Sequence, residues 1–168
     1  LTRTDFINRG TSTDWGDNYG HRQNFIREGV AYFDGVRPSI VFQRGPGDYM
    51  KIHAWDYVGG ALRLRWTWFN HYHLGLPAAE KYADFQQWRI VDVDGDGRDE
   101  IALGGAVIDE YGKPLYGTNL GHGDRFQITK FDPDKSGMQC FAIQQNHPEF
   151  LGSAYYDISN GTMFNTWY

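Results

Sequence analysis

The chain has 168 residues, of which 40% are hydrophobic and 22% charged, so it can bury the core of an ordinary globular domain. Its formal net charge of −5, without an extended run of basic residues, argues against a nucleic-acid partner. No apolar stretch approaches the roughly 18 residues that cross a bilayer, and we therefore expect no membrane partner. Aromatic residues make up 17% of the chain and glycines number 21, which is typical of short strands joined by tight turns.

An internal repeat organises the chain. Three segments each consist of a predicted strand, an acidic turn and a second strand, and each is followed by another hairpin of similar design. In that second hairpin an Asp follows a hydrophobic strand, a Gly turns the chain and an aromatic residue closes it. Alternation with a period of two around Gly, Asp and Asn turns predicts β-hairpins.

Two consecutive hairpins make a four-stranded antiparallel sheet, and three such sheets in a row predict the blades of a β-propeller. In chain order the predicted blades span residues 22–69, 86–120 and 124–168, with an inserted loop over 70–85. Propellers usually need about four to eight blades, so further blades of a longer chain are expected as partners. We therefore predict an all-β fold in which residues 1–168 form part of a β-propeller. The alternative is a three-sheet β-sandwich or prism.

The acidic loop 92–100 is the strongest single motif. Carboxylates stand at its positions 1, 3, 5 and 9, and Gly97 at position 6 permits a tight turn. Hard oxygen ligands from a flexible loop favour calcium over zinc or copper. Strands flank this loop, where an EF-hand has helices, so the ion would stabilise a hairpin. The predicted metal ligands are Asp92, Asp94, Asp96, Glu100 and the backbone carbonyl of Arg98.

Two related turns are weaker candidates. The turn of the third predicted blade, Asp132-Pro-Asp-Lys-Ser-Gly, keeps two carboxylates and a hydroxyl, whereas the turn that begins at Asp34 has too few oxygens and is expected to be empty. The one cysteine, Cys140, lies in an apolar run and is expected to be buried and unreactive.

Six short segments occur in a fixed order along most of the chain. They are Trp15-Gly-Asp-Asn-Tyr-Gly, Gly29-Val-Ala-Tyr-Phe-Asp-Gly-Val-Arg-Pro-Ser-Ile-Val-Phe-Gln-Arg-Gly, Ala54-Trp-Asp-Tyr, Trp66-Thr, Val91-Asp-Val-Asp-Gly-Asp-Gly-Arg-Asp-Glu-Ile and Gly121-His-Gly-Asp. This ordered set resembles the rhamnogalacturonan lyases of polysaccharide lyase family 11. The resemblance implies a secreted, extracellular or periplasmic enzyme with an eight-bladed propeller and structural calcium. Such an enzyme cleaves the rhamnose–galacturonate backbone of a polysaccharide by β-elimination.

A site is expected where the innermost strands of the predicted blades begin, since polar groups from different blades would approach the central axis there. The candidate catalytic residues are His122, Asp124 and His21. The candidate substrate-binding residues are Arg22, Asn24, Gln86 and Gln145.

The resemblance implies a metal centre at this axis, to which His122 and Asp124 correspond. A His and a Glu of the family's centre fall on Gln86 and Gln145 here, so an imidazole and a carboxylate are missing. Three outcomes stay open. The site binds metal weakly, or it performs a metal-free elimination with His122 or His21 as the base, or it does not catalyse.

The predicted function is thus a calcium-containing polysaccharide lyase that acts on a rhamnose–uronate backbone. The alternatives are a lyase on a related polymer such as ulvan, and a non-catalytic, calcium-stabilised propeller that binds carbohydrate.

Overall fold

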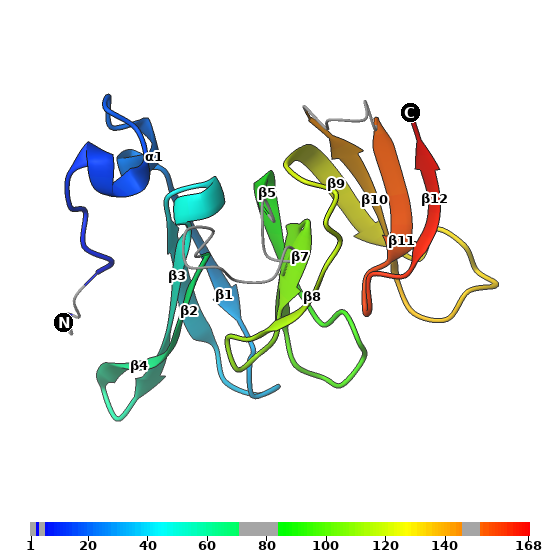
Figure 1. Cartoon of the computed structure of the whole chain (residues 1–168). Helices are drawn as coiled ribbons and strands as arrows, with labels where there is room; N and C mark the ends of the chain where they lie inside the picture. Colours follow the sequence, from blue (N-terminus) through cyan, green and yellow to red (C-terminus); the bar gives the residue numbers. More distant parts are fainter. Residues whose placement is uncertain (1–2, 4–5, 71–83, 146–151) are drawn as a thin grey trace.

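A computed structural model describes residues 3, 6–70, 84–145 and 152–168, and within them the fold is all-β, as predicted (Figure 1). The described helical segments are short: η1 (Ser12–Trp15), α1 (His21–Asn24) and η2 (Gly47–Tyr49). None of the helices in the described ranges has the length and apolar character needed to cross a membrane. Most of the predicted loop 70–85 lies outside the described residues.

The first meander is a four-stranded antiparallel sheet whose strands lie side by side in chain order. Its strands are β1 (Ile26–Ala31), β2 (Ser39–Arg44), β3 (Lys51–Val58) and β4 (Ala61–Phe69). The short segment that contains η1 and α1 precedes β1 and lies near the end of this sheet at which β1 begins (Figure 1).

Two further antiparallel meanders follow, also with their strands in chain order. The second meander consists of β5 (Asp84–Val91), β6 (Glu100–Gly104), β7 (Ala106–Ile108) and β8 (Pro114–Gly117). The third meander consists of β9 (Gly123–Thr129), β10 (Gln139–Gln144), β11 (Ser153–Asp157) and β12 (Met163–Trp167). A parallel pairing of Phe85 with Gly123 joins β5 to β9, so both meanders share one continuous sheet. Strand β5 begins at Asp84, before the predicted start of its blade, because Asp84 pairs with Gly104 of β6 and Phe85 with Gly123 of β9.

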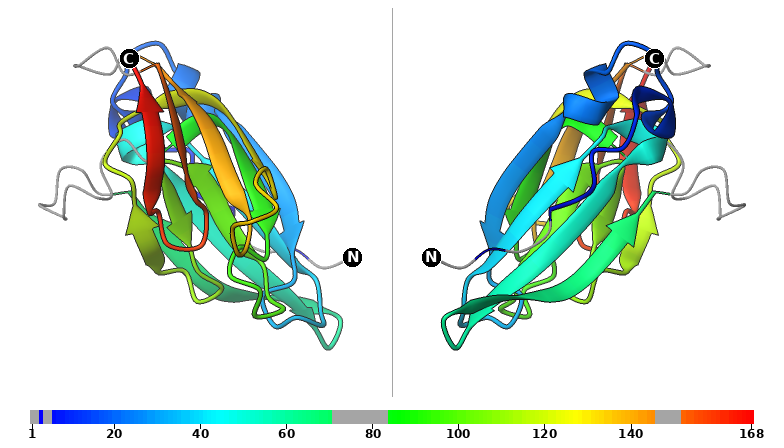
Figure 2. Two further views of the ribbon diagram at one scale, coloured as in Figure 1. Left: turned by 90° about the vertical axis from the view of Figure 1, so that its right-hand side faces the viewer. Right: turned by 90° about the vertical axis from the view of Figure 1, so that its left-hand side faces the viewer.

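Two hydrophobic cores hold the meanders together, one shared by the first and second meanders and one by the second and third. Figure 2 shows the three meanders from the two sides, one behind another. Strand β6 serves both cores: Ile101 and Leu103 belong to the core shared with the first meander, and Ala102 belongs to the core shared with the third. Because side chains alternate between the two faces of a strand, all of β6 is buried. Cys140 lies in the second core, where burial raises the pKa of its thiol to about 12, in agreement with the expected unreactive cysteine.

The junction between β5 and β9 is closely packed. A Cβ atom at Gly123 would clash with the ring of Phe85, so any other residue there would displace this ring. The rings of Phe85 and Phe126 meet edge to face with centroids 5.6 Å apart, and the Tyr156 hydroxyl donates a hydrogen bond of 2.7 Å to the carbonyl of Gly104. These contacts fix the edge of the sheet at which Gln86 and His122 lie.

Candidate functional site

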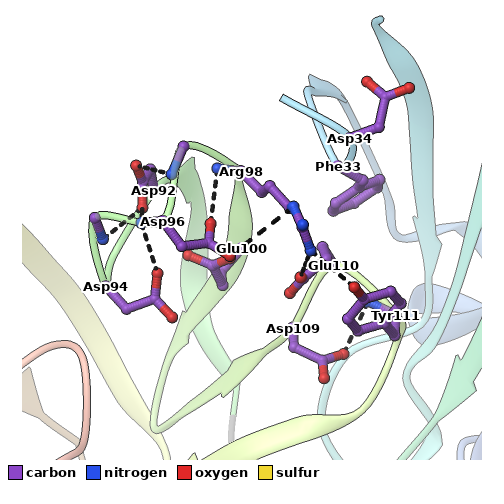
Figure 3. A network of polar contacts seen from close by, with 12 residues as sticks. Phe33, Asp34, Asp92, Asp94, Asp96, Arg98, Glu100, Asp109, Glu110 and Tyr111 are labelled. Atoms are coloured by element: carbon purple, nitrogen blue, oxygen red, sulfur yellow. Dashed lines mark hydrogen bonds and ion pairs between the residues drawn. The ribbon is translucent and has the colours of Figure 1, made fainter. Parts of the chain in front are cut away.

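The acidic loop between β5 and β6 is organised by the carboxylate of Asp92 (Figure 3). Its Oδ1 accepts hydrogen bonds from the N–H groups of Gly95 (2.7 Å) and Asp96 (3.2 Å), and its Oδ2 accepts one from the N–H of Gly97 (2.9 Å). Gly95 and Gly97 have φ values of +82° and +89°, in the left-handed region that favours glycine. The sequence therefore builds a tight turn around a negative charge.

Three carboxylates converge in this loop. Oxygen atoms of Asp92, Asp94 and Glu100 lie within 4.8 Å of one another. Glu100 is fully buried; its Oε2 accepts a hydrogen bond of 2.8 Å from the N–H of Val93, and its Oε1 has no hydrogen-bond partner among the described residues. Burial raises the pKa of Glu100 to about 8, and the nearby aspartates contribute to this rise.

The residues present fit an oxygen-coordinated divalent cation. A buried carboxylate oxygen without a partner is costly, and neighbouring negative charges increase that cost. A hard cation bound by Asp92, Asp94 and Glu100 would satisfy this oxygen and offset the repulsion.

Asp96, another predicted ligand, has contacts of its own with Arg98, whose backbone carbonyl is the remaining predicted ligand. Asp96 Oδ1 accepts a hydrogen bond of 2.8 Å from the N–H of Arg98, and Asp96 Oδ2 lies 3.9 Å from Arg98 Nε. The Arg98 guanidinium also donates to Glu110 Oε1 and to the Tyr111 hydroxyl, both at 2.7 Å (Figure 3). The structure thus gathers Asp92, Asp94 and Glu100, whereas the Asp96 carboxylate faces Arg98. Nothing in the sequence pattern indicated the contribution of Glu110 or Tyr111.

The acidic loop also contacts the first meander. Asp99 Oδ2 accepts a hydrogen bond of 2.7 Å from the N–H of Tyr32, and a Cβ atom at Gly35 would lie 2.7 Å from the carbonyl oxygen of Gly97. A change in the conformation of this loop would therefore alter the interface between the first and second meanders.

The equivalent turn of the third meander has a buried amide where the acidic loop has a buried carboxylate. Gln139 begins β10 as Glu100 begins β6, and it is also fully buried. Its amide accepts from the N–H of Asp132 and donates to the carbonyl of Gly137, both at 3.0 Å. The ammonium group of Lys135 lies 3.7 Å from Asp132. A neutral amide and an internal cation therefore stabilise this turn.

A second polar group lies where β5 and β9 begin. Gln86 Nε2 is 3.3 Å from His122 Nε2, and the backbone N–H of Gln145 donates a hydrogen bond of 3.0 Å to the His122 carbonyl. Gln144, which directly precedes Gln145 in the chain, is only 8% exposed, and within the part of the chain that the structure describes neither polar atom of its side chain has a hydrogen-bond partner. Asp124 is exposed and lies 3.6 Å from Arg125. Gln86, His122 and Gln145 thus meet, and Gln144 is a neighbour that the sequence did not indicate.

The remaining predicted site residues lie in and around α1. The ring of His21 contacts the rings of Tyr19 and Phe25, with centroids 6.4 and 6.3 Å apart. The Arg22 guanidinium lies over the ring of Tyr49, and Asn24 Nδ2 donates a hydrogen bond of 2.8 Å to the carbonyl of Gly20. The candidate residues therefore form two polar groups, each with its own contacts.

The fold and the loop together define a class of all-β protein made of repeated four-stranded meanders with an acidic hairpin loop in which three carboxylates converge. Comparison with known proteins narrows this class. The model of rhamnogalacturonan lyase family 11, C-terminal domain, matches residues 1–167, and the chain belongs to this family. The resemblance seen in the sequence is thereby confirmed.

Relatives from Bacillus subtilis (strain 168) share this region. The chain is 37% identical over 155 residues to the rhamnogalacturonan exolyase YesX, and 35% identical over 153 residues to the rhamnogalacturonan endolyase YesW. These alignments cover 91% of this chain but only 25% and 24% of the two relatives, so the chain spans about a quarter of their length.

Solved structures agree with the fold. The crystal structure of the rhamnogalacturonan lyase YesW matches with a TM-score of 0.85 and 34% identity, over 96% of this chain and 27% of that one. A Bacillus licheniformis rhamnogalacturonan lyase matches with a TM-score of 0.85 and 35% identity, over 95% of this chain and 27% of that one.

Proposed function

We propose that the protein containing this chain is a polysaccharide lyase that cleaves a rhamnose–uronate backbone by β-elimination. The observation that carries this proposal is the family match over residues 1–167. The names of two relatives, an exolyase and an endolyase of rhamnogalacturonan, support the substrate class.

The polar group around His122 supports a role in proton transfer. β-Elimination needs a base for the C5 proton of the uronate, an acid for the leaving oxygen and a group that neutralises the carboxylate. A neutral imidazole beside a Gln86 amide can hold a proton on either nitrogen, because the amide donates or accepts without adding charge. The contact of Gln145 with the His122 backbone would keep this imidazole in position. We therefore propose His122 as the base.

We further propose that the acidic loop binds calcium through Asp92, Asp94 and Glu100. The unpartnered Glu100 Oε1 is the observation that supports it. Calcium bound there would be coordinated by the carboxylate oxygens and would offset their negative charge. Because the loop is a hairpin turn, the ion would stabilise the fold rather than take part in the reaction. Through Asp99, the loop would also hold the first and second meanders together.

We propose that the three meanders are consecutive blades of a propeller completed by the rest of a longer chain. The face-to-face packing and the meeting of the inner strands β5 and β9 support this arrangement. Because a polysaccharide is too large to enter a cell intact, we propose that the enzyme acts outside the cytoplasm, as a secreted or periplasmic protein.

One observation favours a second function. Gln86 and Gln145 are neutral amides at positions where the resemblance implies a His and a Glu. A propeller stabilised by calcium that binds carbohydrate without cleaving it is therefore the rival proposal.

The deciding experiment follows the ultraviolet absorbance of the unsaturated uronate product. The full-length protein is incubated with rhamnogalacturonan and with ulvan, with and without a calcium chelator. A rise with rhamnogalacturonan, lowered about 10²–10⁴-fold in kcat by His122→Ala, supports the lyase. No rise on either polymer, from folded and calcium-loaded protein that still binds rhamnogalacturonan, supports the binding propeller instead.

A further inference from the structure

The segment before β1 is held in one conformation by the carboxylate of Asp17. Its Oδ1 accepts hydrogen bonds from the N–H groups of Gly20 (2.7 Å) and Tyr19 (3.2 Å), and its Oδ2 accepts one from the N–H of Arg22 (2.8 Å). These bonds, that from Arg22 foremost, lower the pKa of Asp17, so the group stays ionised and engaged with the backbone.

The same segment is anchored to the first meander. Trp15 is almost completely buried, with the ammonium group of Lys51 over its ring at 4.6 Å. Arg44 donates a hydrogen bond of 2.6 Å to the carbonyl of Gln23, and the Gln23 amide donates one of 2.6 Å to the carbonyl of Gly10. The solvent-exposed side chains of this segment therefore project from a backbone whose position is fixed by these contacts.

Tyr19 is the most prominent of these side chains. It is 76% exposed, and its ring stacks on the ring of His21 at an interplanar angle of 29°. Two shallow hollows meet at Tyr19: one is bordered by Asn18 and Arg22, and the other by His21 and Asn24. An exposed, supported aromatic ring between two polar hollows suits a ligand that has an apolar face and many hydroxyl groups.

The guanidinium of Arg22 favours a negatively charged ligand. Its guanidinium lies 5.9 Å above the Tyr49 ring centroid, and it forms no salt bridge in the ranges that the structure describes. A guanidinium recognises a carboxylate through two parallel hydrogen bonds. The Asp17 carboxylate interacts electrostatically with Arg22, but its hydrogen bonds are to three backbone N–H groups, which leaves the guanidinium donors for a ligand.

We propose that this surface is a binding subsite for an acidic sugar of the polysaccharide, with the ring on Tyr19 and the uronate carboxylate at Arg22. The proposal rests on the proposed function, since it takes its ligand from the same polymer. The helix α1 and the starts of β5 and β9 lie along the same edge of the three meanders, so one polymer chain can reach both places (Figure 1).

The test uses the full-length protein with Tyr19→Ala, Tyr19→Phe and Arg22→Gln. Binding is measured by calorimetry against rhamnogalacturonan and against the same polymer with its carboxyl groups reduced to alcohols. Tyr19→Ala should weaken binding about tenfold and raise KM with kcat unchanged, as expected when an interaction equal in ground and transition states is lost. Tyr19→Phe keeps the aromatic ring and should bind as tightly as the unmodified protein. Arg22→Gln should bind the native and the carboxyl-reduced polymer with equal affinity.

The matched control is Tyr57→Ala. Tyr57 is 59% exposed and lies at the end of β3 remote from Lys51, and its removal should leave binding unchanged. Equal affinity and KM for Tyr19→Ala, Arg22→Gln and the unmodified protein would overturn the subsite, even if cleavage continues. If no polymer is cleaved but Tyr19→Ala still loses affinity, the subsite stands and the proposed lyase activity fails. If the unmodified protein neither cleaves nor binds the polymer, both proposals are overturned.

Discussion

Asp99 and Tyr32 bind each other twice across the boundary between the second and first meanders. The Asp99 carboxylate accepts a hydrogen bond of 2.7 Å from the N–H of Tyr32, and the Asp99 N–H donates one of 3.3 Å to the Tyr32 carbonyl. Asp99 stands inside the acidic loop but is not one of its converging carboxylates. The loop therefore has two separate features, a cluster of converging carboxylates and a contact between meanders.

This separation predicts a specific effect of Asp99→Ala in the full-length protein. Removing the carboxylate should destabilise the protein by about 1 kcal/mol, because a partly exposed hydrogen bond to a charged group is lost. The melting temperature should fall, while the calcium concentration needed for half-maximal stabilisation should stay the same. A large loss of calcium affinity would show that Asp99 helps to form the cation site.

Glu100→Gln should remove the response to calcium. The amide oxygen can still accept a hydrogen bond from the Val93 N–H, just as the Gln139 amide accepts one from the Asp132 N–H in the third meander. The substitution nevertheless removes a charged ligand from the cluster. Calcium should raise the melting temperature of the unmodified protein and leave that of Glu100→Gln almost unchanged. Asp132→Asn is the matched control, and it should respond to calcium as the unmodified protein does. A full calcium response in Glu100→Gln would contradict the proposed site.

The raised pKa of Glu100 predicts how the calcium-free protein depends on pH. Its folded value is about 8, above the ordinary value of 4.5, so the folded protein binds more protons than the unfolded protein between these values. In chelator, the contribution of Glu100 to stability is therefore fully present below pH 4.5 and is lost as the pH rises toward about 8. Melting curves across this range should show a decline that Glu100→Gln reduces and calcium suppresses. If the melting temperature of Glu100→Gln declines equally over this pH range, titrating groups other than Glu100 cause the decline.

Gln144→Met tests the buried amide at the end of β10. Among the described residues neither polar atom of the Gln144 side chain has a partner, and replacing such a group with an apolar one of similar size is neutral or stabilising. We expect an equal or higher melting temperature of the full-length protein. A lower melting temperature would mean that the amide has a structural partner, such as an ordered water molecule.

Much of the architecture could be predicted because it depends on local sequence. Strand alternation and Gly/Asp turns indicated the all-β class, and Asp92, Asp94 and Glu100 could be placed together because a tight turn brings nearby positions into contact. The contact between Gln86 and His122 followed from the expectation that inner strands begin at one edge.

Other features depend on residues far apart in the chain. The contacts of Asp99 with Tyr32 and of Arg98 with Glu110 join different hairpins, and the spacing of the motif contains no information about them. The exposure of Tyr19 and the missing partner of Gln144 likewise depend on packing against other meanders rather than on local pattern.

The contrast between Gln139 with Lys135 and Glu100 with its proposed cation has a consequence for degradation. The third turn carries its own neutralising charge, so its conformation should not depend on calcium. The second turn is in the middle of the described chain, where both cores meet. In a medium poor in calcium, the first proteolytic nick should therefore fall within residues 92–99, in the centre of the fold rather than at its ends.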